Sequence, residues 1–106
     1  MRVLISGVAG FVGRRLAEHL RDQGHRVAGT CLESPPDLPG VELYEVDLLV
    51  ADLMRRTVQR IAPEAIVHLA GLSHVGQSWT RPGDYFRVNV LGTEALLRSA
   101  ADIRLL

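Results

Sequence analysis

The sequence predicts an α/β protein with one parallel, doubly wound sheet that is covered by helices on both faces. Apolar runs alternate with segments of helical periodicity, and a glycine turn joins the first run to the first such segment. A length of 106 residues corresponds to one domain. Right-handed crossovers give the strand order 3-2-1-4. Ligands of such sheets bind above the carboxyl ends of strands 1 and 4, where the winding reverses.

The first half of the chain is typical of a strand, a helix and a second strand. The strands are expected over residues 3–5 and 26–30, and Gly24 ends the helix between them. The helix carries an apolar stripe on an otherwise charged surface, formed by Val12, Leu16 and Leu20. Three prolines make residues 33–40 a loop.

The second half continues the alternation. A third strand over residues 41–46 precedes a helix over residues 50–61, whose inner face is formed by Leu53, Thr57 and Val58 or Ile61. Residues 65–70 are the most continuous apolar strand, as expected for a strand covered on both faces. A loop over residues 71–82 leads into a last helix over residues 84–101, in which Gly92 is costly unless another segment packs closely against it.

Composition limits the classes of partner. Twelve basic and twelve acidic residues balance, which suggests neither a nucleic acid nor an acidic membrane surface. No segment is long and apolar enough to span a bilayer, and charges interrupt the first twenty residues, so a cytoplasmic protein is expected. The one cysteine, Cys31, cannot form an internal disulfide, and the four scattered histidines predict no metal site.

The glycine turn has the spacing G-x-x-G-x-x-G, with Gly7, Gly10 and Gly13 at the end of a strand and the start of a helix. The first N–H groups of a helix lack intrahelical partners and suit a pyrophosphate. Gly7 would permit the turn, Gly10 would let phosphates approach the backbone, and Gly13 would let the helix lie close to the strand. A plain strand-to-helix turn is the alternative.

Four motifs in order resemble those of the extended short-chain dehydrogenase/reductase family, which contains the NAD-dependent epimerases and dehydratases of nucleotide sugars. The motifs are Gly7–Gly13, Asp47-Leu48, His68-Leu69-Ala70-Gly71 and Val88-Asn89-Val90-Leu91-Gly92-Thr93. The resemblance implies a Rossmann-like NAD(P)-binding domain over residues 1–106, truncated before strand 5 and without the substrate domain. Residues 71–79 are most similar to the GDP-mannose 4,6-dehydratases and GDP-4-keto-6-deoxymannose reductases.

The resemblance also assigns site residues. The glycine turn, including Phe11 and Val12, would hold the pyrophosphate, and the Asp47 carboxylate with the Leu48 backbone would receive the adenine; an Asx-type turn at Asp47 is the alternative. The remaining assignments place Leu69, Ala70 and Gly71 under the ribose and nicotinamide, Asn89 near the floor of the site, and Ser73 and His74 against the sugar. For Asn89 the alternative is a cap on backbone groups, and for Ser73 and His74 it is a surface loop.

The choice of cofactor depends on the end of the second strand. NAD-preferring members place an acid there, but the register from Gly24 puts Cys31 at that position, and Glu33 lies in the loop beyond it. Arg14 and Arg15 follow the glycine turn and could reach a 2′-phosphate, unless they only form a solvated helix face. The sequence therefore slightly favours NADP(H) as the form of NAD(P).

Catalytic residues of the family are absent from the sequence. Its Tyr-x-x-x-Lys pair has no counterpart, because Leu48 and Asn89 stand four residues after the two tyrosines, and all twelve basic residues are arginine. No catalytic residue is assigned, and we expect the NAD(P)-binding portion of a nucleotide-sugar reductase, dehydratase or epimerase that is inactive alone. The alternatives are a dinucleotide-sensing module and a self-associating remnant. An open edge on strand 4 further predicts a homo-oligomer, or a continuation of the polypeptide that covers it.

Overall fold

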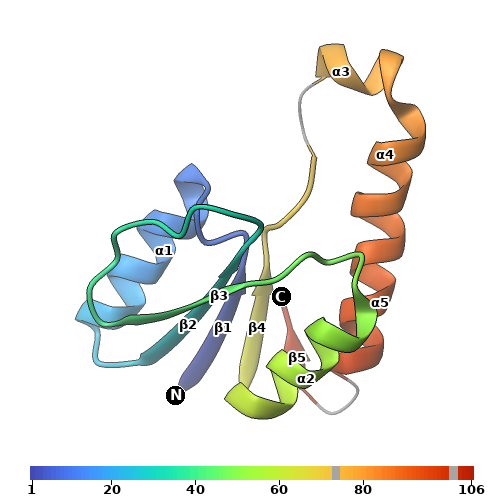
Figure 1. Cartoon of the computed structure of the whole chain (residues 1–106). Coiled ribbons are helices and arrows are strands. Elements are labelled where there is room, and N and C mark those ends of the chain that lie inside the picture. The colour runs from blue at the N-terminus through green and yellow to red at the C-terminus, as the bar shows by residue number, and fades with distance from the viewer. Residues whose placement is uncertain (73–74, 101–102) are drawn as a thin grey trace.

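The apolar runs form one parallel sheet in the order β3-β2-β1-β4-β5, shown in Figure 1. The computed structural model describes residues 1–72, 75–100 and 103–106. Its strands are β1 (Arg2–Ser6), β2 (Arg26–Cys31), β3 (Val41–Glu45), β4 (Ala65–His68) and β5 (Arg104–Leu105). The expected order of the first four strands is confirmed, and the reversal lies between β1 and β4.

The expectation that the chain ends before a fifth strand is wrong. Ala65 pairs with Arg104 and Ile66 with Leu105, so β5 lies alongside β4. The ladder continues where the His68 N–H donates to the Leu106 oxygen at 2.9 Å. The edge of β4 is therefore not open along these residues, which removes the reason given for self-association through it.

Helices cover both faces of the sheet, as Figure 1 shows, with α1 (Phe11–Asp22) on one side and α2 (Ala51–Ile61) and α5 (Gly92–Ser99) on the other. Alternation along β1 divides its side chains between two apolar cores. Val3 and Ile5 pack with Ala17 of α1. Leu4 packs with the second core, which contains Met54 and Val58 of α2 and Leu96 of α5.

The inner face of α1 differs from the expected stripe. Val12 is 60% exposed, whereas Gly13 and Ala17 are buried and Leu16 and Leu20 are half-buried. The reason is the close approach of the helix to the glycine turn, because a Cβ on Gly13 would overlap the Gly7 carbonyl oxygen. Gly13 must therefore face inward, which turns Val12 toward solvent.

The segment after β4 is more helical than expected. Part of the predicted loop over residues 71–82 forms α3 (Val75–Thr80), and the last helix consists of α4 (Pro82–Phe86), a π-helical turn η1 (Arg87–Leu91) and α5. This column extends beyond the carboxyl ends of the strands in Figure 1. None of the helices in the described part of the chain has the length and apolarity needed to cross a membrane.

Candidate functional site

The glycine turn follows directly from the end of β1. Gly7 has φ +76°, a conformation that favours glycine, and a Cβ on it would lie 2.7 Å from the Ala70 nitrogen. The N–H groups of Gly7 and Val8 both donate to the Thr30 carbonyl oxygen at 3.0 Å. The turn is thus fixed between β2 and the segment that leaves β4, and side chains are excluded from its tightest point.

The turn delivers the chain to the N-terminus of α1. Gly10 is the N-cap residue, without a side-chain cap, and its carbonyl oxygen accepts the Arg14 N–H at 2.9 Å. The N–H groups of residues 11–13 precede this first intrahelical bond, and no acidic residue lies in the first turn of α1. These N–H groups and the positive end of the helix dipole are suited to an anion.

A groove of about 290 Å³ runs along the carboxyl ends of β1, β2 and β4, next to this helix terminus. It contains seven of the residues assigned from the sequence: Gly7, Gly10, Asp47, Leu48, Leu69, Ala70 and Gly71. It is also lined by Ala9, Thr30, Cys31, Leu32, Val46, Leu72 and Val88. Its volume lies just below the range of about 300–1,000 Å³ that is common for small-molecule sites.

Asp47 forms an Asx turn and also lines the groove. Its Oδ1 accepts the Leu49 N–H at 2.9 Å, which is the Asx turn, while the residue also lines the groove and is exposed. Among the described residues Oδ2 has no hydrogen-bond partner. One carboxylate oxygen thus fixes the side chain, and the other can accept a hydrogen bond from a ligand.

Asn89 of η1 holds the loop that follows β4. Its Oδ1 accepts the Leu72 N–H and its Nδ2 donates to the Leu72 carbonyl oxygen, both at 2.8 Å. A Cβ on Gly71 would come within 2.9 Å of Oδ1. Asn89 does not line the groove, and it contributes by capping the backbone of the loop that does.

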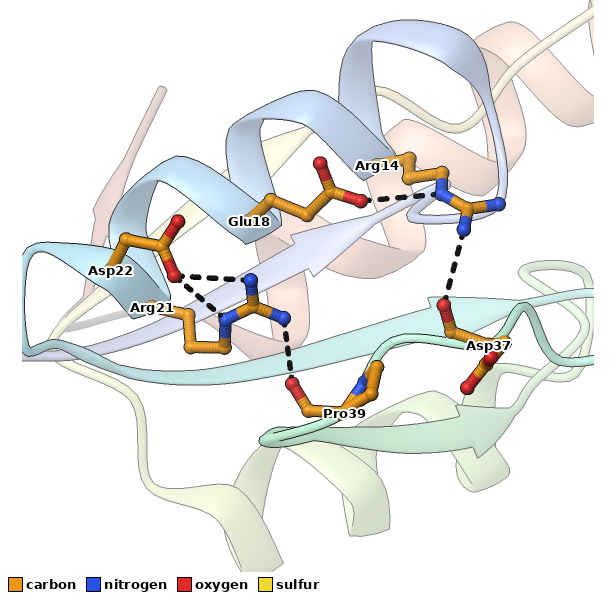
Figure 2. Close-up of polar contacts among 6 residues, drawn as sticks. All are labelled: Arg14, Glu18, Arg21, Asp22, Asp37 and Pro39. Atoms are coloured by element: carbon orange, nitrogen blue, oxygen red, sulfur yellow. Dashed lines mark hydrogen bonds and ion pairs between the residues drawn. The ribbon is translucent and has the colours of Figure 1, made fainter.

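Arg14 lies outside the groove as well. Figure 2 shows its guanidinium between Glu18, at 3.4 Å, and the Asp37 carbonyl oxygen, at 3.2 Å. Arg21, further along the same helix, donates to the Pro39 carbonyl oxygen at 2.7 Å. Both arginines therefore attach the loop between β2 and β3 to α1. Arg15 places its guanidinium over the Phe11 ring, 5.4 Å from the ring centre.

Cys31, the last residue of β2, and Leu32, directly after it, both line the groove. Cys31 is buried, and its thiol donates to the Tyr44 carbonyl oxygen at 3.8 Å. Burial, and secondarily the Glu45 carboxylate, raise the pKa of the Cys31 thiol. The next residue, Leu32, is 67% exposed and also lines the groove. A polar side chain placed at position 32 would therefore be accessible to a ribose, whereas one at the buried position 31 would not.

The remaining assignments divide into two groups. Phe11, Val12 and Gly13 lie in the first turn of α1 beside the groove but do not line it. Ser73 and His74 lie outside the described residues. Sequence reasoning did not single out Ser6 or Thr93, which both hydrogen-bond to His68, although Ser6 directly precedes the glycine turn and Thr93 belongs to a quoted motif. The role of every assigned residue in binding remains a prediction.

Known proteins are similar to this chain in sequence and in fold. The sequence profile of the NAD dependent epimerase/dehydratase family matches residues 3–105. The chain belongs to this family. The chain is 36% identical to dTDP-glucose 4,6-dehydratase of Streptomyces antibioticus over 94% of its own length and 33% of that protein. It is 34% identical to human UDP-glucose 4-epimerase over 91% of its own length and 32% of that enzyme.

Solved structures that are similar to this chain include UDP-glucose 4-epimerases, as the sequence relatives do. The structure of Thermus thermophilus UDP-glucose 4-epimerase in complex with NAD superposes with a TM-score of 0.88 at 33% identity. The match covers 94% of this chain and 33% of the Thermus chain. The chain therefore spans about a third of the length of the relatives it matches.

Proposed function

We propose that this chain is the dinucleotide-binding portion of a nucleotide-sugar epimerase, dehydratase or reductase. The observation that carries the proposal is the groove that joins the glycine turn, the α1 N-terminus and Asp47 at the carboxyl ends of the strands. The match to an epimerase solved in complex with NAD supports the same cofactor class. NAD(P) would supply the hydride acceptor and donor of such a reaction.

The residues present fit a dinucleotide. The pyrophosphate would lie at Gly10 and the N–H groups of residues 11–13, where no side chain fills the space and no carboxylate opposes it. Oδ2 of Asp47 would accept a hydrogen bond from the adenine amino group. The Leu69–Gly71 segment would lie under the nicotinamide ribose, and Asn89 would hold the backbone of this loop in place through Leu72.

Two finer proposals concern the form of the ligands. We infer a GDP-linked sugar from residues 71–79, whereas the two sequence relatives named above act on dTDP-glucose and UDP-glucose. We also infer NADP(H), supported by a thiol in place of an acid at Cys31. Arg15 is the better candidate of the two arginines for the 2′-phosphate. Among the described residues its guanidinium lies over the Phe11 ring and forms no ion pair, whereas that of Arg14 is paired with Glu18.

Calorimetric titration of the chain with NADH and NADPH tests the main proposal. Gly10→Ala is the informative variant, because its Cβ would lie 3.4 Å from the Gly7 oxygen, which the fold tolerates, yet would stand in the groove. We expect at least about tenfold weaker binding, or about 1.4 kcal/mol.

Gly83→Ala is the matched control, since its Cβ would meet only the Arg87 guanidinium at 3.8 Å, away from the groove. It should bind as the wild type does. Equal affinities of the Gly10 and Gly83 variants, or the absence of saturable binding by the wild type at millimolar dinucleotide, would overturn the proposal.

A further inference from the structure

A chain of hydrogen bonds connects the end of β1, the end of β4 and the column of helices through one histidine. His68 Nδ1 lies 2.6 Å from Ser6 Oγ, and His68 Nε2 lies 2.9 Å from Thr93 Oγ1. Ser6 is fully buried, and His68 and Thr93 are half-buried. None of these atoms contacts the groove directly, since neither His68 nor Thr93 lines it.

The Ser6 hydroxyl fixes the direction of the first bond. Its oxygen accepts the Leu69 N–H at 3.0 Å and the Ala70 N–H at 3.2 Å. A hydroxyl oxygen has two acceptor lone pairs and one proton. Because two N–H groups occupy the lone pairs, the Ser6 proton must point to His68 Nδ1, and this nitrogen must be unprotonated.

The Thr93 hydroxyl fixes the second bond in the same way. Thr93 Oγ1 donates its proton to the Asn89 carbonyl oxygen at 2.6 Å. It can then only accept from His68, so Nε2 carries the imidazole proton. The hydrogen-bond network thus assigns the neutral Nε2–H tautomer to His68, with a defined role for each ring nitrogen.

We propose that His68 is a positioning residue that holds the Leu69–Ala70 backbone in its binding geometry only while its imidazole is neutral, so that protonation of His68 weakens dinucleotide binding. A proton on Nδ1 would face a Ser6 oxygen that already accepts two N–H groups. Ser6 Oγ would have to release the Leu69 or the Ala70 N–H. The Leu69 N–H also donates to the Ser6 carbonyl oxygen at 3.1 Å, so the bond to Ala70, which lines the groove, is the one with no second acceptor among the described residues. The dinucleotide part of the inference rests on the proposed function, and the tautomer part does not.

The surroundings of His68 favour the neutral form. Burial lowers the pKa of His68 below its usual value of 6.5, and no charge contributes to this shift. The charged side chains on the elements around β4 are all exposed: Arg2 on β1, Asp52, Arg55, Arg56 and Arg60 on α2, Arg87 on η1, Glu94 and Arg98 on α5, and Arg104 on β5. The Leu106 oxygen accepts the main-chain N–H of His68 and leaves the ring unaffected.

The packing transmits a change at Ser6 to the groove. A Cβ on Gly7 would lie within 2.9 Å of the Leu69 carbonyl carbon as well as close to Ala70, so the two backbones are in contact where β1 and β4 end. A displaced Leu69–Ala70 segment therefore moves against the glycine turn. The side of the groove expected to take the nicotinamide and the side expected to take the pyrophosphate would both change.

NMR of the chain with ¹⁵N-labelled histidine and backbone amides tests the tautomer directly. We expect an unprotonated Nδ1 and a protonated Nε2 at neutral pH, a titration midpoint below 6.5, and amide shifts of Leu69 and Ala70 that follow this titration. A His68 that holds its proton on Nδ1, that titrates at 6.5, or whose titration leaves the Leu69 and Ala70 amides unmoved overturns the proposal.

Binding provides the second readout. The dissociation constant for NADPH or NADH should rise by up to about tenfold per pH unit below the His68 midpoint. His68→Asn keeps an acceptor for Ser6 but cannot titrate, so its affinity should lose this pH dependence. His19→Asn, on the exposed surface of α1, is the matched control and should follow the wild type.

The two hypotheses fail separately. If the chain binds no dinucleotide at pH 7.5, the proposed function fails, while the histidine and amide signals still decide the role of His68. If the chain binds and the His68→Asn variant shows the pH dependence of the wild type, the positioning role is overturned and the proposed function stands.

Discussion

Gly7 and Ala70 touch backbone to backbone: a Cβ built on Gly7 would lie 2.7 Å from the Ala70 nitrogen and 2.8 Å from its Cα. This contact joins the glycine turn after β1 to the segment after β4, which lie more than sixty residues apart in sequence. Both residues line the same groove. The contact therefore sets the width of the groove at the point where the winding of the sheet reverses.

Gly7→Ala should lower the free energy of unfolding by about 2–4 kcal/mol, because the new Cβ combines a positive φ with a clash against backbone that cannot rotate away. Urea denaturation followed by circular dichroism measures the change. Gly83→Ala, which has neither a positive φ nor a close contact, is the control and should stay within about 0.5 kcal/mol of the wild type. Similar unfolding midpoints for the two variants would contradict the close approach.

Leu32→Asp should favour NADH over NADPH. The side chain is exposed at the end of β2, so the carboxylate can accept bonds from ribose hydroxyls and repel a 2′-phosphate. We expect the ratio of the two dissociation constants to change by at least about tenfold, or about 1.4 kcal/mol. Leu97→Asp adds the same charge on α5 and should leave the ratio unchanged. A ratio that responds equally to both variants would indicate a general charge effect.

Acid should destabilise the fold through His68. The pKa of His68 is lowered in the folded chain, so the unfolded chain binds the proton first as the pH falls. The contribution of His68 is fully present above pH 6.5 and is lost as the pH falls from 6.5 toward the folded pKa, by at most about 1.4 kcal/mol per unit. The measurement is the free energy of unfolding of the wild type and of His68→Asn between pH 5 and pH 8, about the range in which histidine titrates. The difference between the two proteins should be smaller at about pH 5 than at about pH 8. Parallel curves would show that the pKa of His68 is the same in the folded and the unfolded chain.

Cys31 should resist alkylation in the folded chain. The thiolate is the reactive form, and burial both raises the pKa of this thiol and shields the sulfur. Labelling by iodoacetamide at neutral pH, followed by mass spectrometry, should be at least about tenfold slower in buffer than in urea. Equal rates would show that the end of β2 opens readily and that the groove is not preformed there.

The features predicted correctly from the sequence are those that local chemistry determines. Gly92 was expected to need a close neighbour, and a Cβ on it would lie 3.2 Å from Leu48 Cβ. Gly24 adopts φ +89° just after α1, as a glycine after a helix commonly does. The strand order followed from the alternation of elements and from the handedness of crossovers.

The features that were missed depend on contacts between distant segments. Val12 has the spacing of a buried residue, but the approach of Gly13 to Gly7 turns it outward. The pairing of β5 with β4 involves two residues, too few for a periodic signal. His68 was assigned only as part of a motif, because nothing in the order of the residues shows that Ser6 and Thr93 meet its two ring nitrogens.

The π-helical turn η1 determines which side chains of α5 face the sheet. A π turn holds one residue more than an α turn, and each residue in a helix advances by roughly 100°. Deleting one residue from Arg87–Leu91 would restore a regular helix, but it would rotate Gly92 away from Leu48 and Thr93 away from His68. The number of residues in this segment is thus as strictly specified as their chemistry, because a change of length there would displace Thr93, which hydrogen-bonds to His68 of β4.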